Sequence, residues 1–145
     1  MSLFLVALNG FFVATEFALV KVRATRLRQL ARGKEVLDCF CYSGGWSVYA
    51  AKGGAKEVIG VDASQRAVDL ASENAAINAC SDNCSFIKSD AFDFLRGMEK
   101  KGEKFDIIVL DPPAFVKNKK ELADAVRGYR EINMTAMKLL SEGGI

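Results

Sequence analysis

The sequence predicts an α/β fold in which a parallel sheet is flanked by helices. Half of the residues are hydrophobic and 26% are charged, which is the composition of a folded domain rather than of a disordered chain. From Lys34 onward, short apolar runs alternate with longer segments of helical period. Turn residues, mainly glycine, proline and aspartate, separate these segments. Strands that alternate with helices form parallel sheets with right-handed crossovers, so we expect this architecture for residues 34–145.

Each element is assigned from its pattern and its flanking residues. Ser64 and Asp90 stand where helix N-caps are expected, and glycine pairs end two of the helices. The expected strands cover residues 35–41, 57–62, 84–88 and 105–110, and a fifth begins at Ile145. The expected helices cover residues 46–52, 65–78, 91–101 and 119–140.

The charge pattern divides the chain near Gly33. Residues 1–33 carry five basic residues and one acid, whereas residues 34–145 carry fifteen basic and seventeen acidic residues. The sequence therefore predicts two parts: an apolar and basic N-terminal helix over residues 1–33, and an α/β domain over residues 34–145.

Residues 1–20 are apolar except for a few polar positions, among them Glu16. About 20 apolar residues suffice for a helix to cross a bilayer. The basic cluster between Lys21 and Arg32 would then lie on the cytoplasmic side. An acid inside a membrane normally faces a partner, so the alternative is an apolar helix attached to a cytoplasmic domain. We expect either membrane association through residues 1–20 or self-association into homo-oligomers.

The composition excludes several kinds of site. The chain has no histidine, which removes Ser-His-Asp triads, Cys-His pairs and histidine-ligated metals. A net charge of +2 argues against a globally basic nucleic-acid clamp. Cys39 and Cys41 leave one strand at its carboxyl end, whereas Cys80 and Cys84 enter another at its amino end. A strand of this length spans about 17 Å, so the two pairs cannot share a zinc ion, and we expect no metal site.

Acidic residues stand at the carboxyl ends of four expected strands. They are Asp38, Asp62, Asp90 and Asp111. In open parallel sheets ligands bind outside these ends. The Gly44-Gly45 turn lets the backbone approach a ligand, but it is not the G-x-G-x-x-G pattern of a dinucleotide site.

The positions of these acids suggest a nucleoside ligand with a cationic tail. Asp62, at the tip of the second strand, is placed to accept both ribose hydroxyls. Asp38 could meet a cationic amino group. Asp90 could accept from the exocyclic amine of adenine, or it could serve only as an N-cap.

The run Asp111-Pro112-Pro113-Ala114-Phe115 contains the only two prolines of the chain. Two prolines make a rigid, extended turn and remove two N–H donors. Asp111 and backbone carbonyls would then face the pocket beside the Phe115 ring, which could stack on a base. The alternative is a loop terminator without function. Lys117, Lys119 and Lys120 could contact phosphate groups of a ligand or simply be solvated.

Several of these motifs agree in order and spacing with one known group. VLDCFCYSGGWSVYAAKGGAKEVIGVDAS, SDAFDFL, KFDIIVLDPPAFVKNKKEL and RGYREINMTAMKLLSEGGI resemble the catalytic domain of class I S-adenosylmethionine-dependent methyltransferases. The resemblance is greatest to the bacterial large-subunit rRNA cytosine-5 methyltransferases of the RlmI type. It implies a Rossmann-like fold, S-adenosyl-L-methionine as cofactor and large-subunit rRNA as partner. An rRNA guanine-N2 methyltransferase is the alternative with similar motifs.

The same resemblance implies roles for individual residues. Asp38, Tyr42, Gly44 and Gly45 would line the methionine part of the cofactor, Asp62 would hold the ribose, and Asp90 would hold the adenine edge. Asp111, Pro112, Pro113 and Phe115 would form the catalytic face where the target base meets the methyl group, with Asp111 also touching the cofactor.

The chain also departs from that group. Its members place an RNA-binding module before this domain and a nucleophilic cysteine beyond the position of Ile145. We therefore expect a C-terminally truncated catalytic domain that does not methylate RNA alone. A nucleotide-binding module without catalysis is a further alternative.

The N-terminal part resembles a different family. NGFFVATEFALVKVRATRLRQLARG, which begins at Asn9, is similar to the start of the transmembrane domain of CorC/HlyC-type (CNNM-like) magnesium and cobalt transport proteins. That resemblance ends at Gly33. It makes a membrane or ion-transport-related protein of the CorC type a further alternative, although one helix does not carry a transport function by itself.

Overall fold

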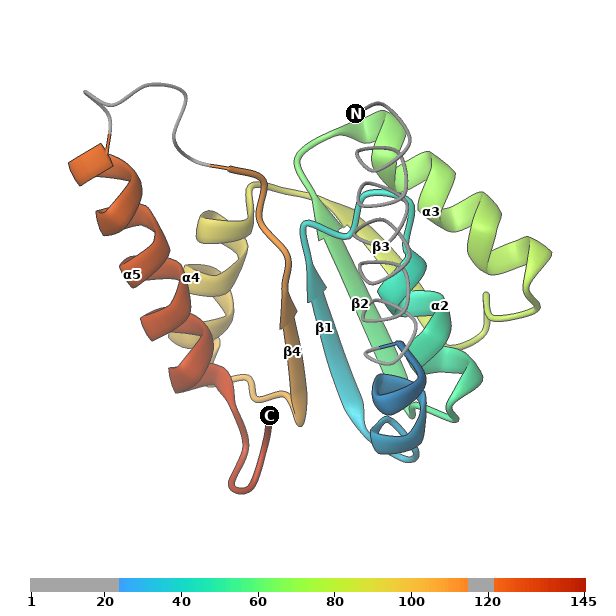
Figure 1. Ribbon diagram of the computed structural model, residues 1–145. Coiled ribbons are helices and arrows are strands. Elements are labelled where there is room, and N and C mark those ends of the chain that lie inside the picture. The colour runs from blue at the N-terminus through green and yellow to red at the C-terminus, as the bar shows by residue number, and fades with distance from the viewer. Residues whose placement is uncertain (1–23, 115–121) are drawn as a thin grey trace, which may run out of the picture.

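A computed structural model describes residues 24–114 and 122–145. In these residues four parallel strands form one sheet in the order β3-β2-β1-β4, with helices on both faces (Figure 1). The strands are β1 (Glu35–Cys39), β2 (Glu57–Asp62), β3 (Cys84–Lys88) and β4 (Ile107–Leu110). The helices are α2 (Gly45–Lys52), α3 (Gln65–Ile77), α4 (Ala91–Lys101) and α5 (Leu122–Leu139). The predicted α/β architecture is confirmed.

The strand register brings the carboxyl ends together at one edge of the sheet. Cys39, the last residue of β1, pairs with Val61 on one side and with Leu110 on the other. The loops that follow β1, β2 and β4 therefore emerge side by side (Figure 1). Beyond β4, Ile145 makes two backbone hydrogen bonds of 2.8 Å, donating to Asp106 and accepting from Ile108. Ile145 therefore pairs with β4, but the described residues include no fifth strand, and the strand expected to begin at Ile145 stays a prediction.

Two strands are shorter than their patterns predicted. The first was expected to reach residue 41 but ends at Cys39, because Phe40 has a φ of 62° and leaves the extended conformation. The fourth was expected to begin at residue 105 but begins at Ile107, and Phe105 forms an isolated bridge with Leu140 instead.

Both predicted N-caps are present. The Ser64 hydroxyl accepts from the Ala67 N–H at 3.4 Å at the start of α3. The Asp90 carboxylate accepts from the N–H groups of Phe92 and Asp93 at 2.9 and 3.1 Å at the start of α4. The last helix was expected from residue 119, and residues 119–121 lie outside the described part of the chain.

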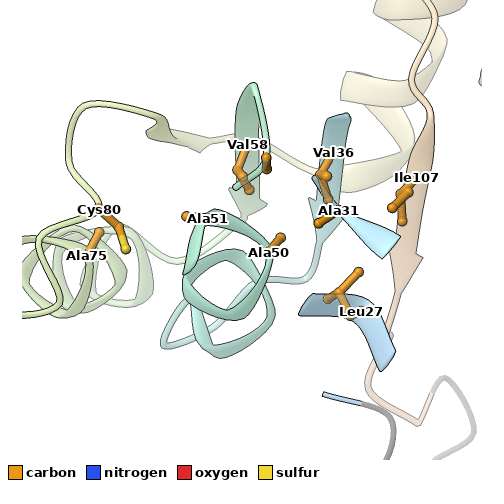
Figure 2. Close-up of a cluster of buried hydrophobic side chains, with 10 residues drawn as sticks. Leu27, Ala31, Val36, Ala50, Ala51, Val58, Ala75, Cys80 and Ile107 are labelled. Atoms are coloured by element: carbon orange, nitrogen blue, oxygen red, sulfur yellow. The ribbon is translucent and has the colours of Figure 1, made fainter. Parts of the chain in front are cut away.

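The core lies on both faces of the sheet. Neighbouring residues of β1 point to opposite faces, so Val36 joins one cluster and Leu37 joins the other. The first cluster packs beneath α2 and α3 (Figure 2), and the second packs beneath α4 and α5. This two-sided burial explains why the strands are almost continuously apolar.

A short helix over residues 24–30 packs against the first cluster. Leu27 and Ala31 are buried there, close to Val36 and Ile107 (Figure 2). The Arg28 carbonyl fills the space that a side chain at Gly53 would need. The described end of the N-terminal segment thus contributes to the α/β core, while the boundary predicted at residue 33 stays a prediction.

Among the residues that the structure describes, no helix is long and apolar enough to cross a membrane. The predicted membrane association depends on residues 1–20, which lie outside the described residues.

Candidate functional site

The loop after β1 is held in an unusual backbone conformation. Phe40 and Tyr42 have φ values of 62° and 46°, which non-glycine residues rarely adopt, and Gly44 has a φ of 72°. Two hydrogen bonds fix the loop: Cys41 N–H donates to the Val61 carbonyl at 3.0 Å, and Gly44 N–H donates to the Cys41 carbonyl at 2.7 Å. Strained backbone of this kind persists only where the surrounding structure holds it in place, and it is concentrated at ligand sites.

The two glycines of this loop have different physical roles. A Cβ on Gly44 would lie 2.9 Å from the Ala71 Cβ and 3.2 Å from the Phe86 ring. Gly44 therefore permits both the positive φ and the close packing of α2 against its neighbours. A Cβ on Gly45 would meet nothing within 4 Å, so Gly45 leaves open space at the start of α2.

Asp38 carries its carboxyl group into the interior of the sheet, where it is completely buried. Its Oδ2 atom accepts from the Ser47 hydroxyl at 2.6 Å and from the Ser47 N–H at 3.1 Å. Its Oδ1 atom is buried and has no hydrogen-bond partner in the described structure. Burial raises the pKa of Asp38 from 3.8 to about 6, against the lowering effect of Ser47, and the charges of Asp111 and Asp62 add to the increase.

Asp62 joins the ends of β1 and β2. Its Oδ2 atom accepts from the Tyr42 N–H at 3.0 Å, and its Oδ1 atom accepts from the Ser64 N–H at 2.9 Å. Each carboxylate oxygen can accept more than one hydrogen bond. Asp62 can therefore shape the loop and still accept ligand hydroxyls.

Asp90 is exposed beyond β3, and both of its backbone bonds fall on Oδ1. The N-cap role that the sequence offered as one alternative is thus present. Because Asp90 is exposed and both bonds fall on one oxygen, the adenine role is compatible with the cap and stays a prediction.

Asp111 follows β4 and is exposed at the edge of the sheet. Its Oδ2 atom accepts from the Trp46 indole N–H at 3.3 Å, which links the start of α2 to the end of β4. The next two residues are Pro112 and Pro113, and the Pro113 carbonyl accepts from the Tyr129 hydroxyl of α5 at 3.4 Å. Phe115, the remaining residue of the predicted catalytic group, lies outside the described residues.

An open pocket of about 320 Å³ lies between the loop after β1, the start of α2 and Asp111. Of the predicted site residues, it brings together Tyr42, Gly45 and Asp111. Asp38, Gly44, Asp62 and Asp90 are not among the described residues that line it, although Asp62 accepts a hydrogen bond from the lining residue Tyr42. The described lining residues are Ala24, Phe40, Cys41, Tyr42, Ser43, Gly45, Trp46, Tyr49 and Asp111.

Three residues near this pocket were not predicted from the sequence. Ser47 holds Asp38, Trp46 holds Asp111, and Tyr49 extends the aromatic wall. Their position within the first turns of α2, directly after the Gly44-Gly45 turn, is the only signal that could have identified them. From the sequence alone, Trp46 and Tyr49 could equally be interpreted as core residues.

Cys39 and Cys41, in and beside the loop after β1, are buried, and Cys84, at the amino end of β3, is partly buried. Burial raises the pKa of Cys39, of Cys41 and of Cys84 to about 12, so these groups keep their protons at neutral pH. A thiolate is the nucleophilic form of cysteine, and these three thiols are therefore unsuited to attack a base.

The strand order, the two helical layers and the ligand-site loops at the carboxyl edge define the Rossmann-like fold of S-adenosylmethionine-dependent methyltransferases. A methyltransferase of this kind from Agrobacterium tumefaciens superposes with a TM-score of 0.74 and 30% identity, over 86% of this chain and 41% of that one. The methyltransferase SMU.776, solved with SAH, gives a TM-score of 0.73 and 31% identity, over 83% of this chain and 32% of that one.

The chain belongs to the family described as "Conserved hypothetical protein 95", whose model matches residues 19–142. Two named relatives are the "Ribosomal RNA large subunit methyltransferase I" proteins of Aeromonas hydrophila and Escherichia coli. The first is 54% identical over 78% of this chain, and the second is 48% identical over 81% of it. The chain spans only 29% and 30% of the length of these two relatives.

Proposed function

We propose that the chain forms the cofactor-binding part of an S-adenosylmethionine-dependent methyltransferase that acts on large-subunit rRNA. The observation that carries the proposal is the arrangement of Asp38, Asp62 and Asp111 around the strained loop after β1. Its support from the comparisons is the 54% identity to a protein named as an rRNA large subunit methyltransferase.

The residues present fit the cofactor. A buried carboxylate oxygen without a partner is costly, and the Oδ1 atom of Asp38 is such an atom. An ammonium group, as on the methionine part of the cofactor, would compensate its charge, whereas Asp62 would accept from the ribose hydroxyls. Bound S-adenosylmethionine supplies an activated methyl group. The chain's own residues would hold the ammonium end at Asp38 and the methyl-bearing sulfur beside Asp111, in a pocket lined by aromatic rings.

The proposed target is carbon 5 of an rRNA cytosine, as the resemblance to the RlmI-type enzymes implies. That chemistry requires a cysteine thiolate, and the high pKa values of Cys39, Cys41 and Cys84 argue against these thiols in that role. The alternative target is the exocyclic N2 of guanine, whose methylation needs no attacking thiolate. The two targets give different modified nucleosides.

Calorimetric titration with S-adenosylmethionine tests the cofactor assignment. We expect Asp62→Ala to weaken binding at least tenfold, since two hydrogen bonds to a charged acceptor contribute roughly 1.5–3 kcal/mol each. Asp69→Ala is the matched control, because Asp69 is an exposed acid on α3 outside the site. Unchanged affinity in Asp62→Ala would refute the ribose role.

Transfer of tritiated methyl groups to unmodified large-subunit RNA tests the activity. Digestion of the product and separation of its nucleosides would distinguish 5-methylcytidine from N2-methylguanosine. Appearance of the label in neither nucleoside, with a chain that binds the cofactor, would leave only the binding function.

A further inference from the structure

The pocket beside Asp111 combines a carboxylate with aromatic rings, and none of the residues that line it in the described part of the chain is basic. Phe40, Tyr42, Trp46 and Tyr49 line it, and Asp111 is its only charged residue in the described part of the chain. Aromatic faces and carboxylates both attract cations. The lining therefore favours a ligand group that carries positive charge.

Trp46 contacts both the core and Asp111. It is partly buried and packs against the hydrophobic cluster beneath α2, and it also lines the pocket. Its indole N–H donates to Oδ2 of Asp111 at 3.3 Å, across 65 residues of sequence. Asp111 precedes a proline, which restricts its backbone to extended conformations. Backbone and side chain are thus both constrained before any ligand binds.

We propose that Trp46 is a positioning residue that orients Asp111 toward the sulfonium charge, so that the site discriminates S-adenosylmethionine from S-adenosylhomocysteine. This inference rests on the proposed function. The cofactor is cationic at sulfur, whereas the product is a neutral thioether, and the remaining parts of the two molecules are the same. A carboxylate held near the sulfur stabilises the cationic cofactor and not the neutral product. This difference favours cofactor binding and product release.

The test compares the dissociation constants of both ligands, measured by calorimetry on the folded chain and three variants. In Asp111→Asn we expect the preference for S-adenosylmethionine over S-adenosylhomocysteine to fall on the order of tenfold. Trp46→Phe retains a ring without the N–H donor. In this variant we expect the same preference for S-adenosylmethionine to fall about threefold. Affinity for S-adenosylhomocysteine should stay within about twofold in both variants.

Gln65→Met is the matched control, because it removes an N–H donor to a carboxylate, the 2.8 Å bond to Asp69, on the exposed face of α3. It should leave both dissociation constants unchanged. Trp46 is the only tryptophan of the chain, so its fluorescence in the wild type gives an independent signal of ligand entry.

The possible outcomes separate the two proposals. If the wild type binds both ligands, and neither Asp111→Asn nor Trp46→Phe changes the ratio of the two dissociation constants, the inference is wrong and the proposed function stands. Equal weakening of both ligands in Trp46→Phe would show a purely structural role and would also overturn the inference. If the wild type binds neither ligand, the proposed function fails and the inference fails with it.

Discussion

The carboxyl group of Asp38 couples the protonation of a single residue to the stability of the sheet. Its pKa of about 6 lies above the ordinary 3.8, chiefly because of burial. The folded chain therefore holds this proton more tightly than the unfolded chain does. Between about pH 4 and 6, stability falls as the pH rises, and above this window the buried charge costs on the order of 2–3 kcal/mol.

We predict that Asp38→Asn abolishes this dependence. Between pH 4.5 and 7.5, the unfolding free energy of the wild type should decrease by about 2 kcal/mol relative to that of the variant. Urea denaturation at both pH values measures the difference. Asp69→Asn, at an exposed acid, is the control and should follow the wild type. An equal effect of Asp38→Asn at both pH values would show that Asp38 does not titrate in this range.

The neighbouring glycines give a second prediction at the same scale. Gly44→Ala should destabilise the fold by about 1–3 kcal/mol, because Gly44 has a φ of 72° and its new Cβ would crowd Ala71. Gly45→Ala should leave thermal stability nearly unchanged but weaken cofactor binding, since its methyl group would enter the pocket. Thermal melts and ligand titration of both variants test this, and equal destabilisation by the two would contradict it.

At the scale of elements, Asp90 can serve α4 and a ligand at once. We predict that Asp90→Ala lowers stability by about 1 kcal/mol through loss of the N-cap. Asp90→Ser should keep most of that stability, because serine is also a good N-cap, yet weaken cofactor binding several-fold. Chemical denaturation and calorimetry separate the two effects. Wild-type affinity in Asp90→Ser would leave Asp90 with only its capping role.

The regular elements could be predicted because each depends on local patterns. The apolar run from Glu57 to Asp62 and the Asp90 cap gave β2 and α4 with the bounds that the structure has. The loop after β1 could not be predicted in the same way. Its positive φ values at Phe40 and Tyr42 are imposed by bonds to Val61 and Asp62, which are distant in sequence.

At the scale of the whole molecule, the candidate site is predictable only in part. The sheet rule placed Asp38, Asp62 and Asp111 at one edge, because parallel strands end together. It could not reveal that Trp46 pairs with Asp111, since that contact depends on how α2 packs against the core. It also could not show that Asp90 stands apart from the pocket while Ala24 lines it.

The helix over residues 24–30 connects the N-terminal segment to the rest of the molecule. The charge pattern assigned this helix to a separate apolar and basic part, because Arg26, Arg28 and Arg32 lie within it or beside it. Those arginines alternate with residues that face inward, of which Leu27 is 9% and Ala31 is 0% exposed. We infer that this helix is part of the α/β domain and contributes to its hydrophobic core.

Truncation of one buried side chain tests this inference. Leu27→Ala should lower the unfolding free energy of the whole domain by about 2–3 kcal/mol, as removal of a buried leucine usually does. Leu30→Ala is the matched control in the same helix, because Leu30 is 42% exposed and its truncation should cost much less. Urea denaturation followed by far-UV circular dichroism reports on the α/β domain as a whole. If both variants unfold at the wild-type urea concentration, the helix is independent of the domain and the boundary predicted at residue 33 is supported.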